Sequence, residues 1–227
     1  MKKLILFSGG PDSTAMTYLL KERYEDLHLI ILADEIKAKN CAELKAARKI
    51  ASVLNLPYKE FDISSLNSLL DGLPNVLISL GSGGEKKSDF AYGEEGAPLS
   101  SQLLHTLAAI HGIANGFDCM FWGVHKGDDL LAGKGWLKEY ITRFNSILQH
   151  SGFSFKLEAP YLNYTKAQLV KEAYEKGAPI ELTFSCITPG VENHCGVCRA
   201  CIERDKVFKS IGIQNGSAVI LEEFSAR

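Results

Sequence analysis

An apolar run, a glycine-containing loop and a helical pattern follow one another at the start of the chain. The apolar run covers residues 4–7, the loop at residues 8–13 reads SGGPDS, and apolar side chains then recur at helical spacing over residues 15–20. This order predicts a buried strand, a tight turn and the first turn of a helix. Backbone N–H groups and the positive end of the helix dipole meet at such a turn, so the segment predicts an α/β unit with an anion site.

The loop carries side chains that suit a phosphate group. Glycines let the backbone approach a bound anion closely, hydroxyl groups donate hydrogen bonds, and Pro11 suits the first position of a helix. The predicted phosphate-binding residues are Ser8, Gly9, Gly10, Asp12, Ser13 and Thr14. The alternative is an ordinary strand-to-helix turn that Asp12 or Ser13 caps.

The length and net charge of the chain limit how many domains it can form and which partners it can bind. The chain has 227 residues, of which 46% are hydrophobic, and a formal net charge of −2. This length suffices for one sizeable domain with a small appendage. The charge gives no support for a broad nucleic-acid surface, no apolar run approaches the roughly 18 residues of a membrane span, and the N-terminus reads as a strand rather than a signal peptide. We therefore expect a cytoplasmic protein that binds neither membrane nor nucleic acid.

Apolar runs alternate with helical patterns along the chain. Further strands are predicted over residues 27–33, 58–63 and 119–124, and helices over residues 41–54 and 101–114. The later helix is expected to bury a stripe of Leu103, Leu104, Leu107, Ala108 and His111. This alternation predicts a parallel sheet, whose ligands bind beyond the carboxyl ends of its strands. The glycine-rich residues 81–88 are either a solvated linker or a lid over that edge.

Four cysteines gather in the C-terminal part of the chain, with eight, two and two residues between them. Thiolates at this spacing can close a tetrahedron around Zn²⁺, which leaves no open position and predicts a structural role. The predicted metal ligands are Cys186, Cys195, Cys198 and Cys201. Gly196 is expected to relieve backbone strain inside the knuckle. The expected organisation is an α/β domain over residues 1–180 and a zinc-binding segment over residues 181–227.

Other uses of these cysteines remain open from spacing alone. A [4Fe–4S] cluster takes the same four ligands, whereas a reducing cytosol disfavours disulfides. His194 could replace one thiolate, although a surface position is expected for it. Cys41 and Cys119 fall in apolar patterns and are expected to be buried structural residues.

The two ends of the chain together resemble the 7-cyano-7-deazaguanine synthase (QueC) family, within the PP-loop ATP pyrophosphatases. The loop at residues 8–13 matches the SGGxDS of that superfamily. Residues 183–186 (TFSC) and 195–201 (CGVCRAC) resemble the C-terminal motif of the family, which Arg204 and Phe208 complete.

The middle of the chain adds to the resemblance. Gly123-Val124 with Asp128 resembles the family's GV-x-x-x-D, and residues 159–166 (APYLNYTK) resemble its late P-L…K motif. Residues 165–168 (TKAQ) also form a capping box, which places Lys166 in the first turn of a helix near the nucleotide.

The resemblance implies a Rossmann-like fold and an ATP-dependent ligase. Family members adenylate 7-carboxy-7-deazaguanine, release pyrophosphate, transfer the acyl group to ammonia, and convert the amide to 7-cyano-7-deazaguanine with a second ATP. The resemblance also implies ATP, Mg²⁺ and Zn²⁺ as cofactors, and a homodimer. The candidate catalytic residues are Lys166, for transition-state charge, and Asp128, which with Asp12 is a candidate Mg²⁺ contact. Ala33 and Gly123 join the candidate nucleotide contacts.

Three segments depart from the family pattern. Residues 33–37 read ADEIK where the family usually has Tyr-x-Gln-Arg-His, although Glu43 matches its acidic helix residue. Residues 98–101 read PLSS rather than Pro-x-Arg-Asn, and residues 132–136 read AGKGW rather than a sequence close to YPDCR. These changes fall where the second substrate or the amine would be handled. They leave open a divergent member that joins the deazaguanine carboxylate to a protein or peptide amine, as some QueC-like proteins of antiphage systems do.

Two further function classes are alternatives to a ligase. A PP-loop enzyme that modifies tRNA, such as a thiolase, commonly has a catalytic cysteine pair and a basic RNA surface, whereas this chain is slightly acidic. A nucleotide sensor that kept the fold and lost the chemistry is the other class. The intact SGGxDS loop argues against such decay.

Overall fold

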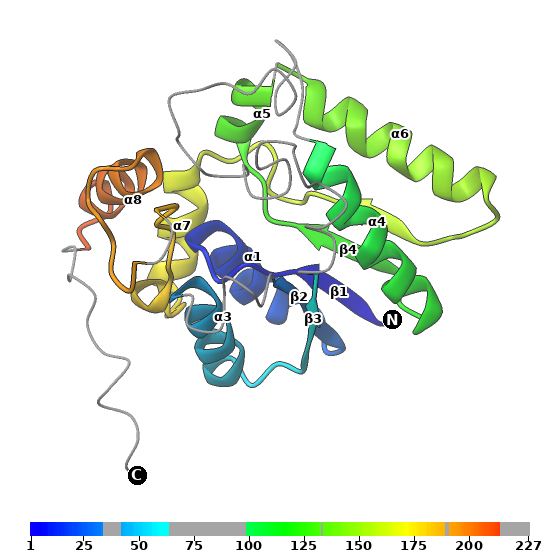
Figure 1. The fold of residues 1–227 in the computed structure, drawn as a ribbon, viewed down its shortest axis with the longest axis horizontal. Helices are drawn as coiled ribbons and strands as arrows, with labels where there is room; N and C mark the ends of the chain where they lie inside the picture. The colour runs from blue at the N-terminus through cyan, green and yellow to red at the C-terminus, as the bar shows by residue number, and fades with distance from the viewer. Residues whose placement is uncertain (34–41, 64–98, 133, 189–190, 214–227) are drawn as a thin grey trace.

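The computed structural model describes residues 1–33, 42–63, 99–132, 134–188 and 191–213. Within them, five strands form one sheet in the order β3-β2-β1-β4-β5 (Figure 1). The strands are β1 (Lys3–Leu6), β2 (Leu27–Ala33), β3 (Tyr58–Asp62), β4 (Cys119–Trp122) and β5 (Lys156–Glu158). All neighbouring strands run parallel, as the alternation of strands and helices predicted.

Helices connect the strands and cover the sheet. They are α1 (Pro11–Lys21), α3 (Ala42–Val53), α4 (Leu99–Ala114), α5 (Lys126–Ala132), α6 (Trp136–His150), α7 (Lys166–Glu175) and α8 (Arg199–Ser210), with a 3₁₀ turn, η2, at Ile180–Leu182. None of the described helices is long and apolar enough to cross a membrane.

Each face of the sheet has its own apolar cluster. On one face, Ile5, Leu29 and Phe121 pack with residues of α1, α3 and α7. On the other face, Leu4 and Ile30 pack with residues of α4 and α6. Side chains alternate between the faces along a strand, so the neighbours Leu4 and Ile5 enter different clusters. Because both faces are covered at the centre of the sheet, β1, β2 and β4 are mostly apolar, whereas the edge strands β3 and β5 carry charged side chains.

The strand order creates a crevice at one edge of the sheet. Strands β2 and β3 extend from β1 in one direction, whereas β4 and β5 extend in the other. The connections that follow β1 and β4 therefore diverge and leave a crevice at the carboxyl ends of these two strands. The loop at residues 8–13 follows β1 and lies at this crevice.

The predicted elements are confirmed to within two residues at their ends, but of the predicted stripe on α4 only Ala108 is fully buried. Leu103, Leu104 and Leu107 are only partly buried. Instead, His105 is 1% exposed, and its Nδ1 lies 2.8 Å from the Tyr140 hydroxyl of α6. The hydrogen bond satisfies the polar imidazole ring, so His105 can be buried on the face of α4 where the sequence pattern predicted leucines.

The predicted capping box at the start of α7 is present. Gln168 N–H donates to Thr165 Oγ1 at 3.2 Å, and Thr165 N–H donates to Gln168 Oε1 at 2.9 Å. Two donors at the helix N-terminus are thereby satisfied. Lys166 lies in the first turn, as predicted.

The C-terminal segment packs on the α/β layers. Phe208 and Ile213 join the cluster around α1, while Phe184 packs with Ala42 and Ala46 of α3. The division between residues 180 and 181 stays a prediction. Cys119 is buried as expected, whereas Cys41 and residues 81–88 lie outside the described residues.

We expect Ile5→Ala to lower the free energy of unfolding by about 2–5 kcal/mol, because Ile5 is fully buried in the central strand. Val53→Ala, at a position 50% exposed at the end of α3, is the control and should change stability by less than about 0.5 kcal/mol. Urea unfolding followed by circular dichroism measures both. Equal losses would contradict the central placement of β1.

Candidate functional site

The loop at residues 8–13 packs closely against two other segments. Gly9 has a φ of 77°, and a Cβ at this position would lie 2.7 Å from Ala47 N of α3. The Gly9 carbonyl also accepts a hydrogen bond from Phe184 N–H at 3.2 Å. Both the backbone conformation and the close approach of α3 therefore require glycine here.

Hydroxyl groups line the turn. Ser8 Oγ lies 3.1 Å from Ser13 Oγ and accepts a hydrogen bond from Gly10 N–H at 3.3 Å, and Ser13 Oγ donates to the Gly10 carbonyl at 3.2 Å. The N-cap of α1 is Gly10, and no side chain caps this helix. The alternative in which Asp12 or Ser13 caps α1 is therefore wrong, because both side chains bond elsewhere. A helix N-terminus of this kind suits an anion.

Three buried polar atoms beside the loop have no hydrogen-bond partner among the described residues: Asp12 Oδ1, Thr14 Oγ1 and Ser185 Oγ. Ser185 follows the residue that bonds the Gly9 carbonyl. A fourth such atom, Tyr161 Oη, belongs to the core cluster. Each buried polar atom without a partner costs about 1–3 kcal/mol, so three around one loop point to a ligand. A phosphate chain with its cation fits two hydroxyl donors and one carboxylate.

A charged cluster lies beside the loop. Lys166 Nζ is 2.9 Å from Asp12 Oδ2 and 3.4 Å from Glu203 Oε2. His125 Nε2 lies 3.6 Å from Asp12 Oδ1, and His125 Nδ1 lies 3.4 Å from Asp128 Oδ2. The structure thus brings the predicted residues Asp12, Asp128 and Lys166 into one place, although three different helices carry them.

Burial and neighbouring charges shift two pKa values in this cluster. Burial by itself would lower the pKa of Lys166, but the carboxylates of Asp12, Glu203 and Asp128 outweigh it and raise the pKa. Lys166 therefore stays protonated at neutral pH. Burial raises the pKa of Asp128, with His125 opposing the rise and Asp12 adding to it.

Sequence reasoning did not identify His125 and Glu203. His125 is 3% exposed and lies inside the segment that resembles GV-x-x-x-D, and Glu203 comes two residues after the last cysteine. Gly127 N–H donates to His125 Nδ1 at 3.0 Å, so the ring proton is on Nε2 and faces Asp12. Proximity to the matched Asp128 was the available signal for His125, whereas only the packing of α8 on α7 revealed Glu203.

Two more predicted residues lie at the same edge of the sheet. A Cβ at Gly123 would lie 3.0 Å from Ser13 Cα, so glycine lets the end of β4 contact the first turn of α1. Ala33 ends β2, the strand beside β1, and is 7% exposed. Contact of either residue with a nucleotide stays a prediction.

The four cysteines converge on one point, with all four Sγ atoms within 4.8 Å of one another. The Sγ atoms of Cys186 and Cys198 are 4.0 Å apart, and those of Cys195 and Cys201 are 3.9 Å apart. Zn–S bonds of about 2.3 Å in a tetrahedron place sulfur atoms about 3.8 Å apart. The Cys198 N–H donates to Cys195 Sγ at 3.3 Å, and Gly196 between them has a φ of 74°. The donor set and its spacing therefore fit a metal ion.

His194 is partly buried rather than a surface residue, and it does not replace a thiolate, because all four cysteines are in the cluster. Its Nε2 accepts a hydrogen bond from Ser185 N–H at 3.3 Å, and its ring packs on Phe184 with the centroids 4.6 Å apart. Among the described residues, the cysteine cluster is the one group of His, Cys, Asp and Glu side chains whose ligand atoms lie close enough for a metal. A cation at the charged cluster would therefore need ligands from the phosphate chain as well.

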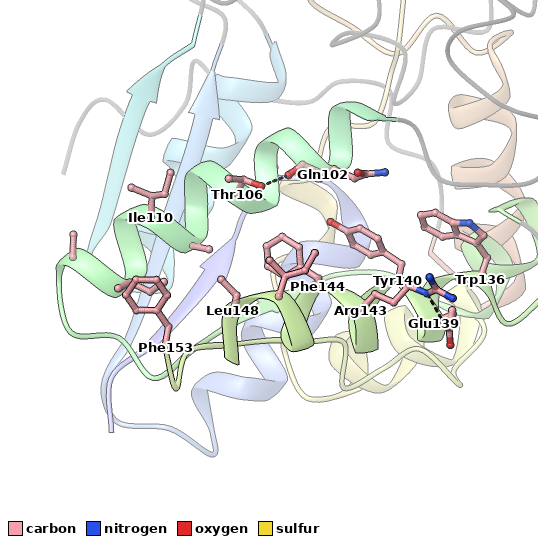
Figure 2. Close-up of a pocket in the computed structure, with 14 residues that line it drawn as sticks. Gln102, Thr106, Ile110, Trp136, Glu139, Tyr140, Arg143, Phe144, Leu148 and Phe153 are labelled. Carbon is pink, nitrogen blue, oxygen red and sulfur yellow. Dashed lines mark hydrogen bonds and ion pairs between the residues drawn. The ribbon is translucent and has the colours of Figure 1, made fainter. Parts of the chain in front are cut away.

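A separate groove of about 950 Å³ lies between α4 and α6 (Figure 2). Figure 2 shows Ile110 of α4 on one side, and Phe144 and Leu148 of α6 on the other. Its charged lining residues are Glu139 and Arg143, paired at 2.7 Å. Because the lining is mostly apolar, this groove does not suit a phosphate chain, and the loop at residues 8–13 is the better nucleotide site.

Comparison with known proteins gives matches along nearly the whole chain. A family model described as "Queuosine biosynthesis protein QueC" matches residues 2–212. The chain is 29% identical over 220 residues to a 7-cyano-7-deazaguanine synthase of Caldicellulosiruptor bescii, covering 95% of this chain and 96% of the relative. It is 31% identical over 225 residues to 7-cyano-7-deazaguanine synthase 2 of Sulfurisphaera tokodaii, covering 94% of this chain and 47% of that protein.

A solved structure shares the fold. The U34-tRNA thiolase NcsA from Methanococcus maripaludis, described with its [4Fe-4S] cluster, aligns with a TM-score of 0.51 and 18% identity. The alignment covers 93% of this chain and 67% of that one. The Rossmann-like α/β fold expected from the resemblance is thus confirmed.

We expect the full-length protein to carry metal at the cysteine cluster and Cys198→Ser to lose it, because a hydroxyl is a poor substitute for a thiolate ligand. Elemental analysis of purified protein gives the content. One zinc per chain identifies a zinc site, whereas iron with acid-labile sulfide identifies an iron–sulfur cluster. Cys119→Ala, at a buried thiol outside the cluster, is the control and should keep the metal. Full metal content in Cys198→Ser would contradict the assignment.

Proposed function

The chain belongs to the QueC family of queuosine biosynthesis proteins, and on that premise we propose that it is an ATP-dependent ligase acting on 7-carboxy-7-deazaguanine. The observation that carries the proposal is the set of buried polar atoms on Asp12, Thr14 and Ser185 that have no hydrogen-bond partner among the described residues, together with the Lys166 cation 2.9 Å from Asp12. The phosphates of ATP would accept hydrogen bonds from the two hydroxyls, and the cation that accompanies the phosphates would bind the Asp12 carboxylate.

The carboxylate of the substrate is a poor electrophile, so the proposed reaction first activates it with ATP. A carboxylate oxygen of the substrate bonds to the α-phosphorus of ATP, the α-phosphorus to bridging-oxygen bond breaks, and pyrophosphate leaves. The lone pair of ammonia then bonds to the acyl carbon, AMP leaves with the former carboxylate oxygen, and ammonia loses a proton to give the amide. A second ATP activates the amide oxygen in the same way and releases pyrophosphate, and loss of AMP with that oxygen and of both protons on the amide nitrogen leaves the nitrile.

The residues of the site bind and orient the phosphates. The uncapped N-terminus of α1 and the nearby hydroxyls bind the pyrophosphate portion. Lys166 stabilises the negative charge that grows on the leaving pyrophosphate. Asp12 holds the lysine 2.9 Å away, and the Nε2–H of His125 faces the same carboxylate and helps to orient it. Because the lysine side chain is already held in place, no conformational entropy has to be lost to order it during the reaction.

The charge balance of the cluster favours a divalent cation with the nucleotide. Asp12 and Glu203 pair with Lys166, and Asp128 lies close enough to help raise the pKa of the lysine. A polyphosphate would be repelled by three carboxylates, so we propose Mg²⁺ held by phosphate oxygens together with Asp12 or Asp128. At the cysteine cluster we propose Zn²⁺ in a structural role, since four thiolates leave no position for a substrate.

The identity of the amine separates the two candidate functions. Ammonia is the proposed acceptor. A protein or peptide amine is the second candidate, because residues 100 and 101 are serines where the family pattern has Arg and Asn. Ser101 is 4% exposed on α4. At this buried position a serine takes up less room than the asparagine of the family pattern would.

We expect incubation with ATP and 7-carboxy-7-deazaguanine to release AMP and pyrophosphate in a substrate-dependent manner. Chromatography of the nucleotides measures AMP, and mass spectrometry of the products distinguishes amide, nitrile and protein conjugate. If AMP formation does not depend on the substrate, the ligase proposal is wrong. A mass increase on a protein without free amide or nitrile would favour the second candidate.

We expect Lys166→Ala to lower the rate of AMP formation by about 100- to 1,000-fold, because it removes the cation that faces the developing charge. Lys171→Ala on the same helix is the control. Lys171 is exposed and pairs with Glu175 on the surface, so its loss should leave the rate nearly unchanged. If the Lys166→Ala variant forms AMP at the normal rate, Lys166 has no part in the proposed mechanism.

A further inference from the structure

Helix α8 begins in the cysteine cluster and lies beside α7, which in turn lies beside α1 (Figure 1). Cys198 is the N-cap of α8, and its Sγ accepts a hydrogen bond from Cys201 N–H at 3.4 Å. Glu203 and Arg204 follow in the next turn. Both side chains reach groups that contact the nucleotide loop.

The first contact runs through Lys166. Glu203 Oε2 lies 3.4 Å from Lys166 Nζ, which lies 2.9 Å from Asp12 Oδ2 in the first turn of α1. The lysine side chain is only 14% exposed. Because its long chain is held between two carboxylates from different helices, the position of α8 influences where the cation sits.

The second contact runs through the segment before the first cysteine. Arg204 is 6% exposed, stacks over the Phe208 ring at 4.0 Å, and donates from Nη1 to Thr183 Oγ1 at 2.5 Å. The next residue, Phe184, donates from its N–H to the Gly9 carbonyl of the loop. Arg204 therefore holds the segment that supports the loop from outside.

The same cysteines join both contacting segments. Cys186 ends the Thr183–Cys186 segment, and Cys201 lies in the first turn of α8. The apolar cluster around them is small, with Ala42, Ala46 and Phe184 as its other buried members. A metal bound by four thiolates would therefore add strongly to the contacts that hold this segment against α8.

We infer that the cysteine-bound metal and the nucleotide loop are coupled through α8, with Glu203 and Arg204 as positioning residues for Lys166 and for the Thr183–Phe184 segment. The ligand class is a nucleoside triphosphate with its divalent cation. This inference rests on the proposed function, because it assumes that the loop holds ATP. Its test measures nucleotide binding without the deazaguanine substrate.

Metal removal is the first arm of the test. Affinity for Mg–ATP is measured by calorimetry on zinc-loaded full-length protein, on protein stripped with a chelator, and after zinc is restored. We expect stripping to weaken binding about tenfold or more, which corresponds to about 1.4 kcal/mol, and zinc to restore it. Far-UV circular dichroism should show that the sheet persists. Equal affinity in a stripped protein that keeps its sheet would overturn the coupling.

The second arm of the test uses variants that keep the metal. These variants test the coupling even if removal of the metal unfolds the protein. Glu203→Gln removes one charge beside Lys166, and Thr183→Val removes the acceptor of the Arg204 hydrogen bond with little change of shape. We expect each to weaken Mg–ATP binding about tenfold with full zinc content, and Glu203→Asp to recover part of the loss. Glu175→Gln, on the exposed surface of α7, is the control. Unchanged affinity in both variants would overturn the coupling.

The outcomes separate this inference from the proposed function. Metal-dependent ATP binding without substrate-dependent AMP would uphold the coupling and overturn the ligase. Zinc-loaded protein that binds no Mg–ATP at all would overturn both.

Discussion

The backbone of Gly9 is the constraint on which the rest of the structure depends. Its positive φ turns the chain from β1 into α1, and the absence of a Cβ lets Ala47 of α3 and the Phe184 N–H approach the same residue. Any side chain would meet the backbone of α3 before it met a ligand. The sheet, the helix layer over it and the C-terminal segment therefore meet at this loop.

The topology of the doubly wound sheet brings the charged side chains of the site together. Because β1 and β4 are neighbours whose connections diverge, the segment after β4 brings His125 and Asp128 to the start of α1. Helix α7 adds Lys166, and α8 adds Glu203. No single element carries enough of this cluster to bind a nucleotide, so its chemistry depends on the crossing of four helices at one crevice.

The C-terminal segment is part of the site as well as a support for it. Ser185 contributes one of the unpartnered hydroxyls, and its neighbours bond the loop on one side and belong to the cysteine cluster on the other. A structural metal there would stabilise the segment that packs against the loop at residues 8–13. The apolar groove between α4 and α6 is separate from this arrangement and lacks its donors.

The sequence by itself determined the features whose causes are local. Glycines, hydroxyls and the SGGxDS pattern predicted the loop, residues 165–168 predicted the start of α7, and cysteine spacing predicted the cluster. Period-based reasoning failed on α4, because the Tyr140 hydrogen bond buries His105 where leucines were expected. Only the tertiary structure decided that His125 and Glu203 join Asp12 and Lys166, and that Lys166 stays charged among three carboxylates. Those outcomes depend on distances between helices far apart in the chain, and no residue spacing encodes such distances.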